Sequence, residues 1–463
     1  MNINDEITIE SIQGTIEDVF KYSAEKIKSI ENSWDPKKGT PVYTVDGNYT
    51  TRGWTEWTRG FQYGSSILQF DATGDEQFLE FGKKATVEQM APHVSHIGVH
   101  DHGFNNISTY GNLLRLMNEG KIIENEWERK FYELALKLSG AVQASRWTNL
   151  NDGLGYIYSF NGPHSLFSDT IRTVRVLAIA HQLGHSLMGE NDEKINLLKR
   201  LLLHAEATAR YNVYFGKGRD GYDVKGRVVH ESIFDLNNGE YRCPSTQQGY
   251  SPFTTWTRGQ AWIISGYAEQ LEFLNTLDNS DIEQLNIPNM ISKEKAINRF
   301  LETVRAAADF YINETPTDGI PYWDTGAPNL DKIEDWKNKP SDPYNDFEPV
   351  DSSAAAIAAQ GFLRLGKVLE KSNPQEAEHY FKAGLTIAEN LFKEPYLSTD
   401  PTHQGLLLHS VYHQPNRWDS IPDGRKIACN EATMWGDYHA RELALYLKRL
   451  ASNEPYYKFY LDL

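Results

Sequence analysis

Residues 351–392 read DSSAAAIAAQGFLRLGKVLEKSNPQEAEHYFKAGLTIAENLF and contain two helix-length segments joined by a short polar turn. The first segment, 351–370, is rich in small residues, which is typical of a helix that is buried on most sides. The second segment, 374–392, combines an apolar stripe with a charged face, which is typical of an outer helix. The stretch therefore predicts an αα-hairpin with one inner and one outer helix.

The same layout recurs along the chain. Trp54, Trp57 and Phe61 fall at i, i+3 and i+7, which predicts a helix from Trp54 to about residue 70, and a turn at Thr73–Gly74 leads to a second helix. Two more pairs and two single helices are predicted from the same periodicity, over 168–184 with 192–211, 257–274 with 293–312, and over 16–30 and 432–450.

No Gly/Ser-rich or Pro/Gln-rich linker divides the chain, so we expect one domain over residues 1–463. Strand signals are weak, as in GRVVHESIF at 226–234, and the predicted fold is all-α. The irregular segments 211–256, 316–350 and 395–431 each precede a helix rich in small residues. Long loops in a compact protein usually carry function. We therefore expect a toroid of nested hairpins, with these loops around a pocket at one mouth.

The composition narrows the classes of partner. The chain has 46 Lys+Arg against 63 Asp+Glu and a net charge of −17, which argues against binding to nucleic acid or to an anionic membrane surface. The chain has no run of about 18 apolar residues, so no membrane-spanning helix is predicted. Aromatic residues make up 12% of the chain, which fits either a well-packed core or a site where flat rings stack on sugars. The sequence does not indicate an oligomeric state.

The two cysteines, Cys243 and Cys429, are expected to be reduced, inert thiols, because a chain of this length does not need a disulfide. The N-terminal segment MNINDEITIESIQG is acidic and polar and lacks the pattern of a signal peptide. We therefore expect a cytoplasmic protein, or a periplasmic one if a signal has been removed.

Asp101 lies in GVHDHGFNNISTYG, between His100 and His102, just before a predicted helix. An aspartate at such a position is most often a helix N-cap, and a functional carboxylate is the alternative. A metal site is less favoured, because adjacent side chains do not easily point at one ion and no further ligand set has metal-site spacing. We therefore expect no bound metal.

Asp169 lies in NGPHSLFSDTIRTVRVL, again at the start of a predicted helix. Ser168 could cap that helix instead and leave Asp169 in the first turn, where the helix dipole favours an anion. Arg172 and Arg175 follow, so burial would raise the pKa of this carboxyl and nearby cations would lower it. A group tuned in this way is suited to acid–base chemistry.

Further candidates lie in the loop before the helix at 257–274. His230 lies between apolar residues and is more often a structural histidine, and Gln248 resembles an ordinary loop amide. Arg258 and Trp262 share a helix face at i, i+4, and an arginine at the start of an inner helix can clamp a carboxylate with its guanidinium fork. The chain has no P-loop, dinucleotide fingerprint, GxSxG elbow or HExxH motif, which leaves a carboxylate-based site as the main option.

Nine stretches in order along the chain resemble the unsaturated glucuronyl hydrolases of glycoside hydrolase family 88. They are WTEWTRGF (54–61), HDHGF (100–104), SDTIRTV (168–174), VVHES (228–232), STQQGYS (245–251), TWTRGQAW (255–262), PYWD (321–324), DSSAAAI (351–357) and WGDYHARELAL (435–445). The resemblance implies an (α/α)6 toroid. It also implies removal of a 4,5-unsaturated uronate from oligosaccharides that polysaccharide lyases generate, with no cofactor.

The resemblance also implies roles for individual residues. Asp169 matches the general acid/base and Asp101 the second essential aspartate. The residues that match the surroundings of the unsaturated uronate are His230, which could assist the base, and Gln248, Arg258, Trp262 and Trp57. Burial of Asp169 beside Asp101 would keep the proton donor neutral. The chain departs from the family at TIRTVR (170–175), where Arg172 and Arg175 either alter the charge of the pocket or pair elsewhere.

Three alternatives stay open. A family 105 enzyme acting on unsaturated rhamnogalacturonides shares the predicted fold, and so do saturated-sugar glycosidases and polysaccharide lyases of the toroid type. A helical-repeat interaction protein is an alternative from another class. It is less favoured, because such repeats have a fixed period and short loops.

Overall fold

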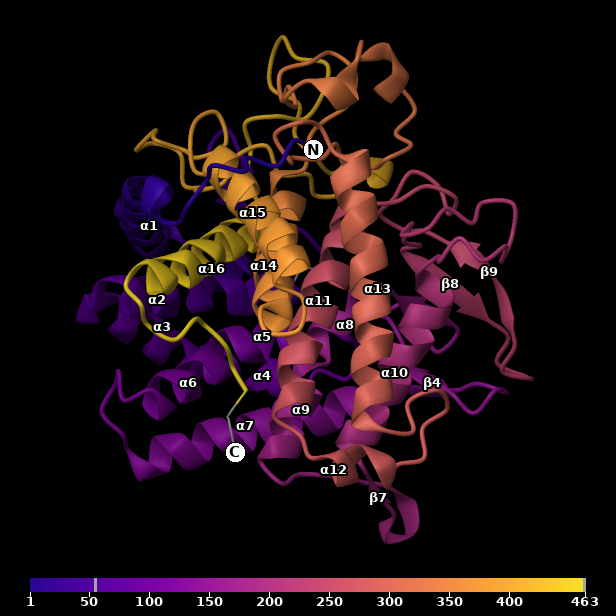
Figure 1. The fold of residues 1–463 in the computed structure, drawn as a ribbon. Coiled ribbons are helices and arrows are strands. Elements are labelled where there is room, and N and C mark those ends of the chain that lie inside the picture. The colour runs from indigo at the N-terminus through magenta and orange to yellow at the C-terminus, as the bar shows by residue number, and fades with distance from the viewer. Residues whose placement is uncertain (54–55, 461–463) are drawn as a thin grey trace.

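The computed structural model describes residues 1–53 and 56–460, and this part of the chain forms a ring of helical hairpins (Figure 1). Each hairpin has one inner and one outer helix. The inner helices are α2 (Arg59–Thr73), α5 and α6 (His102–Asn106 and Asn112–Asn118), α8 and α9 (Thr170–Thr173 and Arg175–Gln182), α11 (Thr257–Asn275), α14 (Ser352–Leu369) and α16 (Met434–Ala451). The outer helices are α3 (Glu76–Gln89), α7 (Glu126–Ser145), α10 (Leu197–Asn212), α13 (Lys293–Glu314), α15 (Pro374–Leu391) and α1 (Gln13–Ser33).

The inner helices contact one another in chain order, and α16 packs against α2 to close the ring. Helix α1 precedes this ring in the sequence and packs on the outside of α16, so the first and last helices form the final pair. The predicted all-α toroid is therefore confirmed. Short helices and turns complete the helical part: α4 (Ala91–Val94), α12 (Asn279–Glu283), a π-helical turn at Ile107–Gly111 and 3-10 turns at Glu10–Ile12, Pro36–Lys38, Glu56–Thr58, Glu190–Asp192, Leu330–Lys332, Trp336–Asn338 and Gln414–Asn416.

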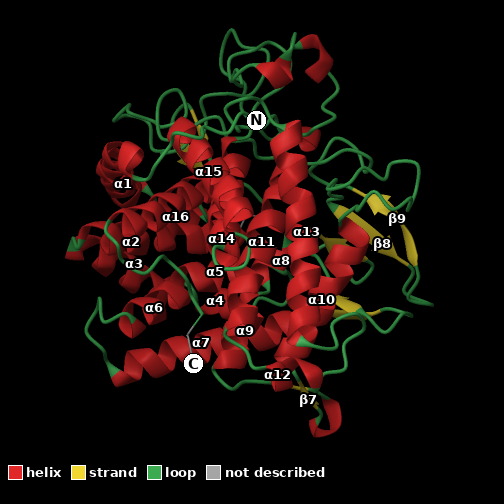
Figure 2. Ribbon diagram, in the orientation of Figure 1, coloured by secondary structure: helices red, strands yellow, loops and turns green. Residues whose placement is uncertain are grey.

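The strands are short and lie in the loops, with β8 and β9 at one side of the ring (Figure 2). A three-stranded antiparallel sheet has the order β5-β8-β9, from Ser165–Phe167, Glu231–Phe234 and Tyr241–Ser245. The middle strand, β8, falls within the segment 226–234, where the sequence indicates a strand only weakly. The remaining strands form two-stranded pairs: β1–β2 (Tyr43–Val45, Asn48–Thr50), β3–β4 (Trp147–Asn149, Gly155–Ile157) and β6–β7 (Leu187–Met188, Lys194–Ile195).

Small residues let the inner helices approach closely. A Cβ at Gly103 of α5 would lie 1.9 Å from the carbonyl oxygen of Thr173, and a Cβ at Gly361 of α14 would lie 2.7 Å from the backbone nitrogen of Ser265. Side chains larger than hydrogen would therefore force neighbouring helices of the ring apart. This explains the small-residue composition from which the inner helices were predicted.

The inner helices begin at the same mouth of the ring. The N-cap residue of α14, Asp351, accepts a hydrogen bond of 2.7 Å from Arg258 near the start of α11. Trp435 at the start of α16 stacks on Trp57, which lies just before α2, with ring centroids 5.0 Å apart. The predicted gathering of loops at this mouth is also present, because Lys426 in the segment 395–431 forms an ion pair with Asp346 in the segment 316–350.

The structure departs from the helix prediction at two places. The predicted helix from Trp54 begins at Arg59 as an α-helix, after a 3-10 turn at Glu56–Thr58, and Trp54 itself lies outside the described residues. The hairpin of α5–α6 with α7 was not predicted. Its inner half is interrupted by the π-helical turn, and α7 carries large apolar side chains on its solvent face as well as on its buried face.

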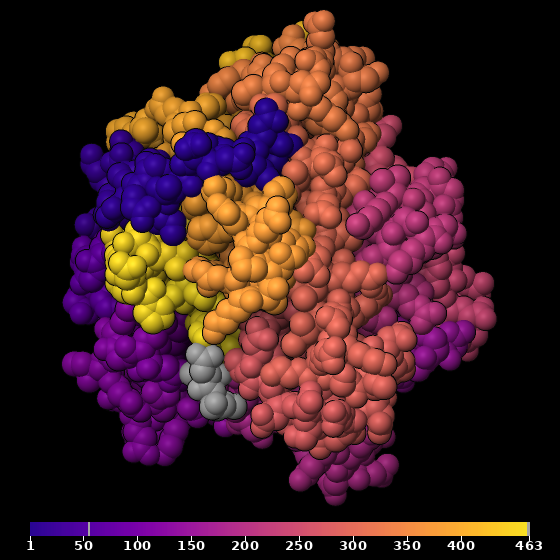
Figure 3. Space-filling view, in the orientation of Figure 1, coloured from indigo at the N-terminus to yellow at the C-terminus, as the bar shows by residue number. Residues whose placement is uncertain are grey.

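The N-terminal segment, the two cysteines and the polarity of the helices complete the description of the fold. The N-terminal segment crosses the top of the hairpins (indigo in Figure 3), where the Asn2 N–H donates to the carbonyl of Thr317. Cys243 and Cys429 are both free thiols, as predicted. Among the described residues, the helices are too short or too polar to span a bilayer.

Candidate active site

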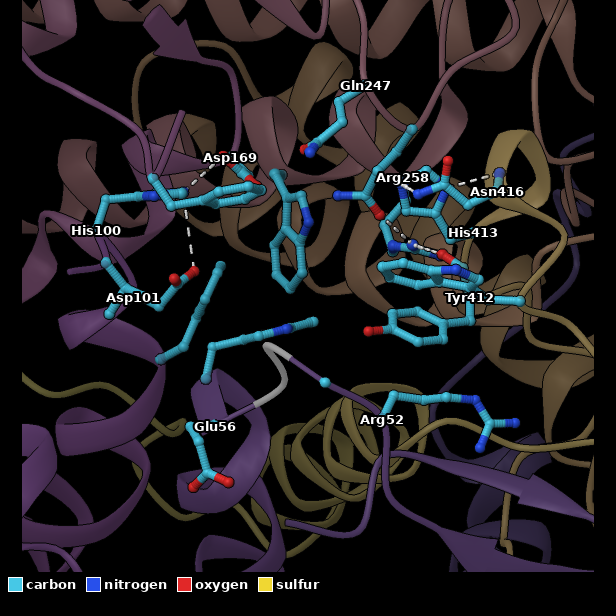
Figure 4. Close-up of a pocket in the computed structure, with 18 of the residues that line it drawn as sticks. Arg52, Glu56, His100, Asp101, Asp169, Gln247, Arg258, Tyr412, His413 and Asn416 are labelled. Atoms are coloured by element: carbon cyan, nitrogen blue, oxygen red, sulfur yellow. Dashed lines mark hydrogen bonds and ion pairs between the residues drawn. The ribbon is translucent and has the colours of Figure 1, made fainter. Parts of the chain in front are cut away.

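A cavity of about 960 Å³ opens at the mouth where the inner helices begin. Figure 4 shows acidic and imidazole groups at one side of it and an arginine with several aromatic rings at the other. The lining residues come from segments far apart in the chain: Arg52, Gly53, Glu56, Trp57, His96, Gly98, Val99, His100, Asp101, Phe104, Phe160, Asp169, Gln247, Gln248, Trp256, Arg258, Trp262, Tyr412, His413, Asn416 and Trp418.

Two buried carboxylates converge on His100 in the wall of this cavity. Nε2 of His100 lies 3.3 Å from Oδ1 of Asp169 and 3.8 Å from Oδ1 of Asp101, and the dashed lines of Figure 4 mark both contacts. The imidazole stacks on Phe160, with ring centroids 6.1 Å apart. The predicted meeting of Asp101 and Asp169 in one pocket with Arg258 and Trp262 is thus present, and His100 lies between the two carboxylates.

The backbone around each carboxylate is fixed by neighbouring elements. Asp169 follows strand β5, and the Ser168 N–H just before it donates to the His230 carbonyl at 2.8 Å, continuing the β5–β8 pairing. Gln143 of α7 donates to the His100 carbonyl at 2.6 Å and also to the Thr173 hydroxyl. One outer helix therefore holds the segments that carry both His100 and Asp169.

The carboxylates are not used as helix caps. Asp101 and Asp169 occupy the N-cap positions of α5 and α8, yet within the described residues neither side chain makes a capping hydrogen bond. The cap interpretation of Asp101 is therefore wrong, as is the prediction that Ser168 caps the helix after it. Because neither carboxylate is used in a capping hydrogen bond, both are available for chemistry.

His102 does not join them. Its Nδ1 lies 2.9 Å from the Ser139 hydroxyl and its Nε2 lies 2.9 Å from the His96 carbonyl, so both ring nitrogens are engaged behind the cavity wall. Among the described residues, no group of three or more His, Cys, Asp or Glu side chains could hold a metal ion.

The three charges of the Asp101–His100–Asp169 group are coupled. Burial alone would raise the pKa of Asp169, but the contact with His100 holds it below its ordinary value. Burial raises the pKa of Asp101, and the attraction of His100 offsets only part of that rise. Burial also opposes a charged imidazole, but the two carboxylates raise the pKa of His100. In the free site these shifts favour a charged imidazole beside an ionised Asp169, and the expectation of a neutral Asp169 with substrate bound stays a prediction.

His230 lies behind the cavity wall rather than in it. Its Nδ1 accepts hydrogen bonds from the backbone N–H groups of Gln247 at 3.1 Å and Gln248 at 3.3 Å. Burial lowers the pKa of His230 to about 4, so the ring is neutral and its proton lies on Nε2. The ring packs between Phe167 and Trp256, with centroids 4.4 and 4.6 Å away. His230 therefore fixes the loop that presents the two glutamines.

Arg258 lines the cavity, but its guanidinium is already engaged. Nη1 donates to Asp351 at 2.7 Å and to the Val411 carbonyl, and Nη2 donates to Oε1 of Gln248 at 3.0 Å and to the Tyr412 carbonyl at 2.9 Å. The predicted bidentate clamp on a substrate carboxylate is not available, because both terminal nitrogens are occupied. The contact also orients Gln248, whose amide NH2 is left as the donor.

Aromatic rings form the rest of the wall. Trp262, one turn along α11 from Arg258, is buried and packs on Phe104 with ring centroids 4.7 Å apart. Trp57 lies 6.0 Å from Phe104 by the same measure. Trp418, in the segment 395–431, remains partly exposed at the rim. Both tryptophans predicted for the site therefore line the cavity, and rings of this kind suit the apolar faces of sugars.

Arg172 and Arg175 point away from the cavity into the centre of the ring. Arg172 pairs with Glu269 at 2.7 Å and with Glu442 at 3.0 Å, and Arg175 pairs with Glu269 at 3.4 Å. The alternative that these arginines pair elsewhere is therefore confirmed. Their charges are neutralised inside the ring, and the cation beside Asp169 is His100.

Sequence reasoning missed several lining residues. His100 was considered only as a metal ligand, although its place beside Asp101 could have suggested a proton carrier. Tyr412, His413 and Trp418 lie in the segment 395–431, which was predicted to be functional without any residue being named. The segment 316–350 contributes no residue to the lining within the described chain and instead supports the neighbouring loops.

No family model matches the chain. A curated relative, the unsaturated glucuronyl hydrolase of Bacillus sp. (strain GL1), is 26% identical over 449 residues, covering 94% of this chain and 97% of the relative. The unsaturated chondroitin disaccharide hydrolase of Streptococcus agalactiae serotype III (strain NEM316) is 23% identical, with 87% and 84% covered. The crystal structure of the unsaturated glucuronyl hydrolase from Bacillus sp. GL1 superposes with a TM-score of 0.68 at 23% identity, covering 96% of this chain and 98% of that one.

The ring of hairpins with paired carboxylates in an aromatic cavity defines a glycoside hydrolase of the (α/α)6 type. The similarity extends over nearly the full length of both the sequence relative and the solved structure. Within that class, the chain is similar to the unsaturated glucuronyl hydrolases over nearly its whole length.

Proposed function

We propose that this chain, acting as a single catalytic domain, removes a 4,5-unsaturated uronate from the non-reducing end of oligosaccharides generated by polysaccharide lyases. The observation that carries the proposal is the pair of buried carboxylates, Asp101 and Asp169, that meet at His100 in an aromatic cavity. The names of the relatives support the same reaction class. The partner is therefore an oligosaccharide that carries an unsaturated uronate.

The substrate decides which bond reacts first. Its C4=C5 double bond is conjugated to the carboxylate and attached to the ring oxygen, so it is a vinyl ether that accepts a proton at C4. Asp169 donates that proton, the π electrons form the new C4–H bond, and positive charge develops at C5 and the ring oxygen. A positioned acid of this kind contributes about 10²–10⁴-fold to the rate.

Water then adds to C5, and its proton passes to the Asp169 carboxylate, which restores the acid. The product is a hemiketal at C5. Its C5–O bond to the ring oxygen breaks to give a ketone, and the hemiacetal left at C1 releases the aglycone sugar with its oxygen. One water is consumed, and no oxidant, metal or organic cofactor enters the balance.

His100 supplies the proton that Asp169 donates. The two carboxylates raise the pKa of His100, which favours the charged imidazole, and Nε2 lies 3.3 Å from the Asp169 oxygen that must receive the proton. The anionic uronate adds negative charge to the cavity, which raises the pKa of every acid around it and so favours a protonated Asp169. Asp101, whose Oδ1 lies 3.8 Å from the same Nε2, stabilises the charged ring until the proton is transferred.

Other lining groups hold the sugar. The Gln248 amide, oriented by Arg258, donates from its NH2 to an oxygen of the uronate, and the charge of Arg258 attracts the carboxylate without a direct fork. Trp57 and Trp262 cover the apolar faces of the sugar ring. His230 acts through Gln248 as a positioning residue, because its ring does not line the cavity.

The test is hydration of unsaturated disaccharides in heavy water, followed by loss of the ultraviolet absorbance of the conjugated acid and by the mass of the product. We expect the absorbance to fall and one deuterium to appear at C4. A panel of disaccharides from glycosaminoglycan, gellan, xanthan and algal polysaccharides compares aglycones. A rise in absorbance on intact polysaccharide would indicate a lyase. Release of sugar from saturated glycosides alone would overturn the proposal.

A further inference from the structure

Helix α7 carries an apolar stripe on the face that points to solvent. Trp127, Phe131, Leu134 and Leu138 are 83%, 41%, 54% and 44% exposed. Their spacing of four, three and four residues places them on one side of a helix with 3.6 residues per turn. The opposite face is also apolar, where Leu136 and its neighbours are buried against the inner helices. Among the described residues, packing within one copy of the chain therefore leaves this apolar face of α7 exposed.

The stripe has the size of the largest apolar patches found on protein surfaces. If each of the four side chains has a total area of roughly 200 Å², the exposed fractions add up to about 450 Å² of apolar surface. The largest apolar patches on monomers measure about 300–600 Å². A standard interface buries about 800 Å² on each partner, of which somewhat more than half is apolar. The stripe alone thus supplies roughly the apolar share of one side of a stable interface.

The spacing of the stripe is the same in both directions along the helix. The pairs Trp127–Leu138 and Phe131–Leu134 share one midpoint. In a second copy whose α7 runs antiparallel, Trp127 of one copy would therefore lie opposite Leu138 of the other, and Phe131 opposite Leu134. A two-fold symmetric contact requires such self-complementarity, because the same surface serves both partners.

Charge on α7 also fits a second copy. Between residues 126 and 138 the helix carries three glutamates and three basic residues, so this face is neutral, whereas the chain as a whole carries −17. Two copies that each carry −17 repel each other at long range, and contact through a neutral segment adds least to that repulsion, whereas an anionic membrane would be repelled. Lys130 and Glu126 already pair along the helix at 2.5 Å, so the charges beside the stripe are matched within each copy.

We infer that α7 is the contact surface of a homodimer, in which the stripes of two copies pack antiparallel about a two-fold axis. In Figure 1 this helix lies at the lower edge of the ring. The dimer is independent of the proposed function, because none of the four stripe residues lines the cavity.

The test is the molar mass of the intact chain in solution, by light scattering after size exclusion and by sedimentation velocity, from about 1 to about 200 µM, which spans the affinity expected of an interface of this size. We expect a mass near twice 52.8 kDa for the wild type. Leu134→Glu places two carboxylates next to the two-fold axis, and we expect the monomer mass at every concentration. Leu236→Glu is the matched control, because Leu236 is also 54% exposed and lies outside the stripe.

A wild-type chain that stays at 52.8 kDa over the whole range overturns the inference. A dimer that survives Leu134→Glu as well as it survives Leu236→Glu also overturns it, since the contact would then lie elsewhere. Circular dichroism of each variant establishes that a change in mass does not come from unfolding. If the proposed reaction fails on every substrate, the mass measurement still decides the dimer.

Discussion

Replacement of Asp169 by asparagine is the most direct test of the site. The side chains have the same shape, so the fold and the cavity should be unchanged. The amide of the Asp169→Asn variant cannot donate a proton to C4 or accept one from water, and it cannot receive the proton that His100 holds 3.3 Å away. Loss of general acid catalysis alone costs about 10²–10⁴-fold in rate, which corresponds to about 3–5 kcal/mol in activation free energy.

The assay is the loss of ultraviolet absorbance of an unsaturated disaccharide under single-turnover and steady-state conditions. We expect kcat to fall at least 10²-fold, while substrate binding measured by calorimetry changes little. A kcat for Asp169→Asn within about tenfold of the wild type would refute the assignment of Asp169 as the proton donor.

His230→Ala is the contrasting variant. It removes the acceptor of two backbone N–H groups, those of Gln247 and Gln248, which costs about 1–3 kcal/mol for each group left unsatisfied. The effect should therefore appear in stability and KM more than in kcat. If His230→Ala lowered kcat as much as Asp169→Asn, His230 would be a catalytic base rather than a positioning residue.

Three further outcomes are expected. His100→Gln should move the alkaline limb of the kcat/KM–pH profile to lower pH. The pKa of His100 is raised above 6.5, so the imidazole keeps its proton to a higher pH than the carboxyls that remain in the variant. An unchanged alkaline limb would contradict proton transfer from His100 to Asp169. Arg258→Lys should raise KM about tenfold or more with a smaller change in kcat, because one ammonium cannot hold the Gln248 amide and the neighbouring carbonyls together, and equal KM values would exclude this role. Glu442→Gln should lower the free energy of unfolding in urea by about 3–5 kcal/mol, because Arg172 loses a buried partner, and an unchanged denaturation midpoint would contradict this account.

Local sequence motifs predicted which residues lie in the site better than they predicted the contacts of those residues. Asp101, Asp169, Arg258 and Trp262 were predicted to meet in one pocket, and the structure brings them together. The role of Arg258 was predicted less well, because its partners Asp351 and Tyr412 come from segments about 90 and 150 residues away in the sequence. A local motif identifies a candidate side chain but not which distant acceptors occupy it.

The direction of the pKa shift of Asp169 could not be predicted from the sequence either. Burial beside a second carboxylate predicts a neutral Asp169, whereas the observed position of His100 between Asp101 and Asp169 reverses the direction of the pKa shift. The distance that decides this, 3.3 Å, joins two residues 69 positions apart. Such a distance depends on the packing of α5 against α8, where Gly103 allows close approach.

The sequence by itself determined that this protein is a set of helical hairpins with inner and outer helices, because helical periodicity and residue size are local properties that record which face is buried. It also identified the two aspartates through their motifs. Only the tertiary structure decided that His100 lies between the two carboxylates, that the Arg258 guanidinium is already occupied, and that one face of α7 is exposed among the described residues. These depend on contacts between segments far apart in the chain, and closure of the ring sets the distances between them.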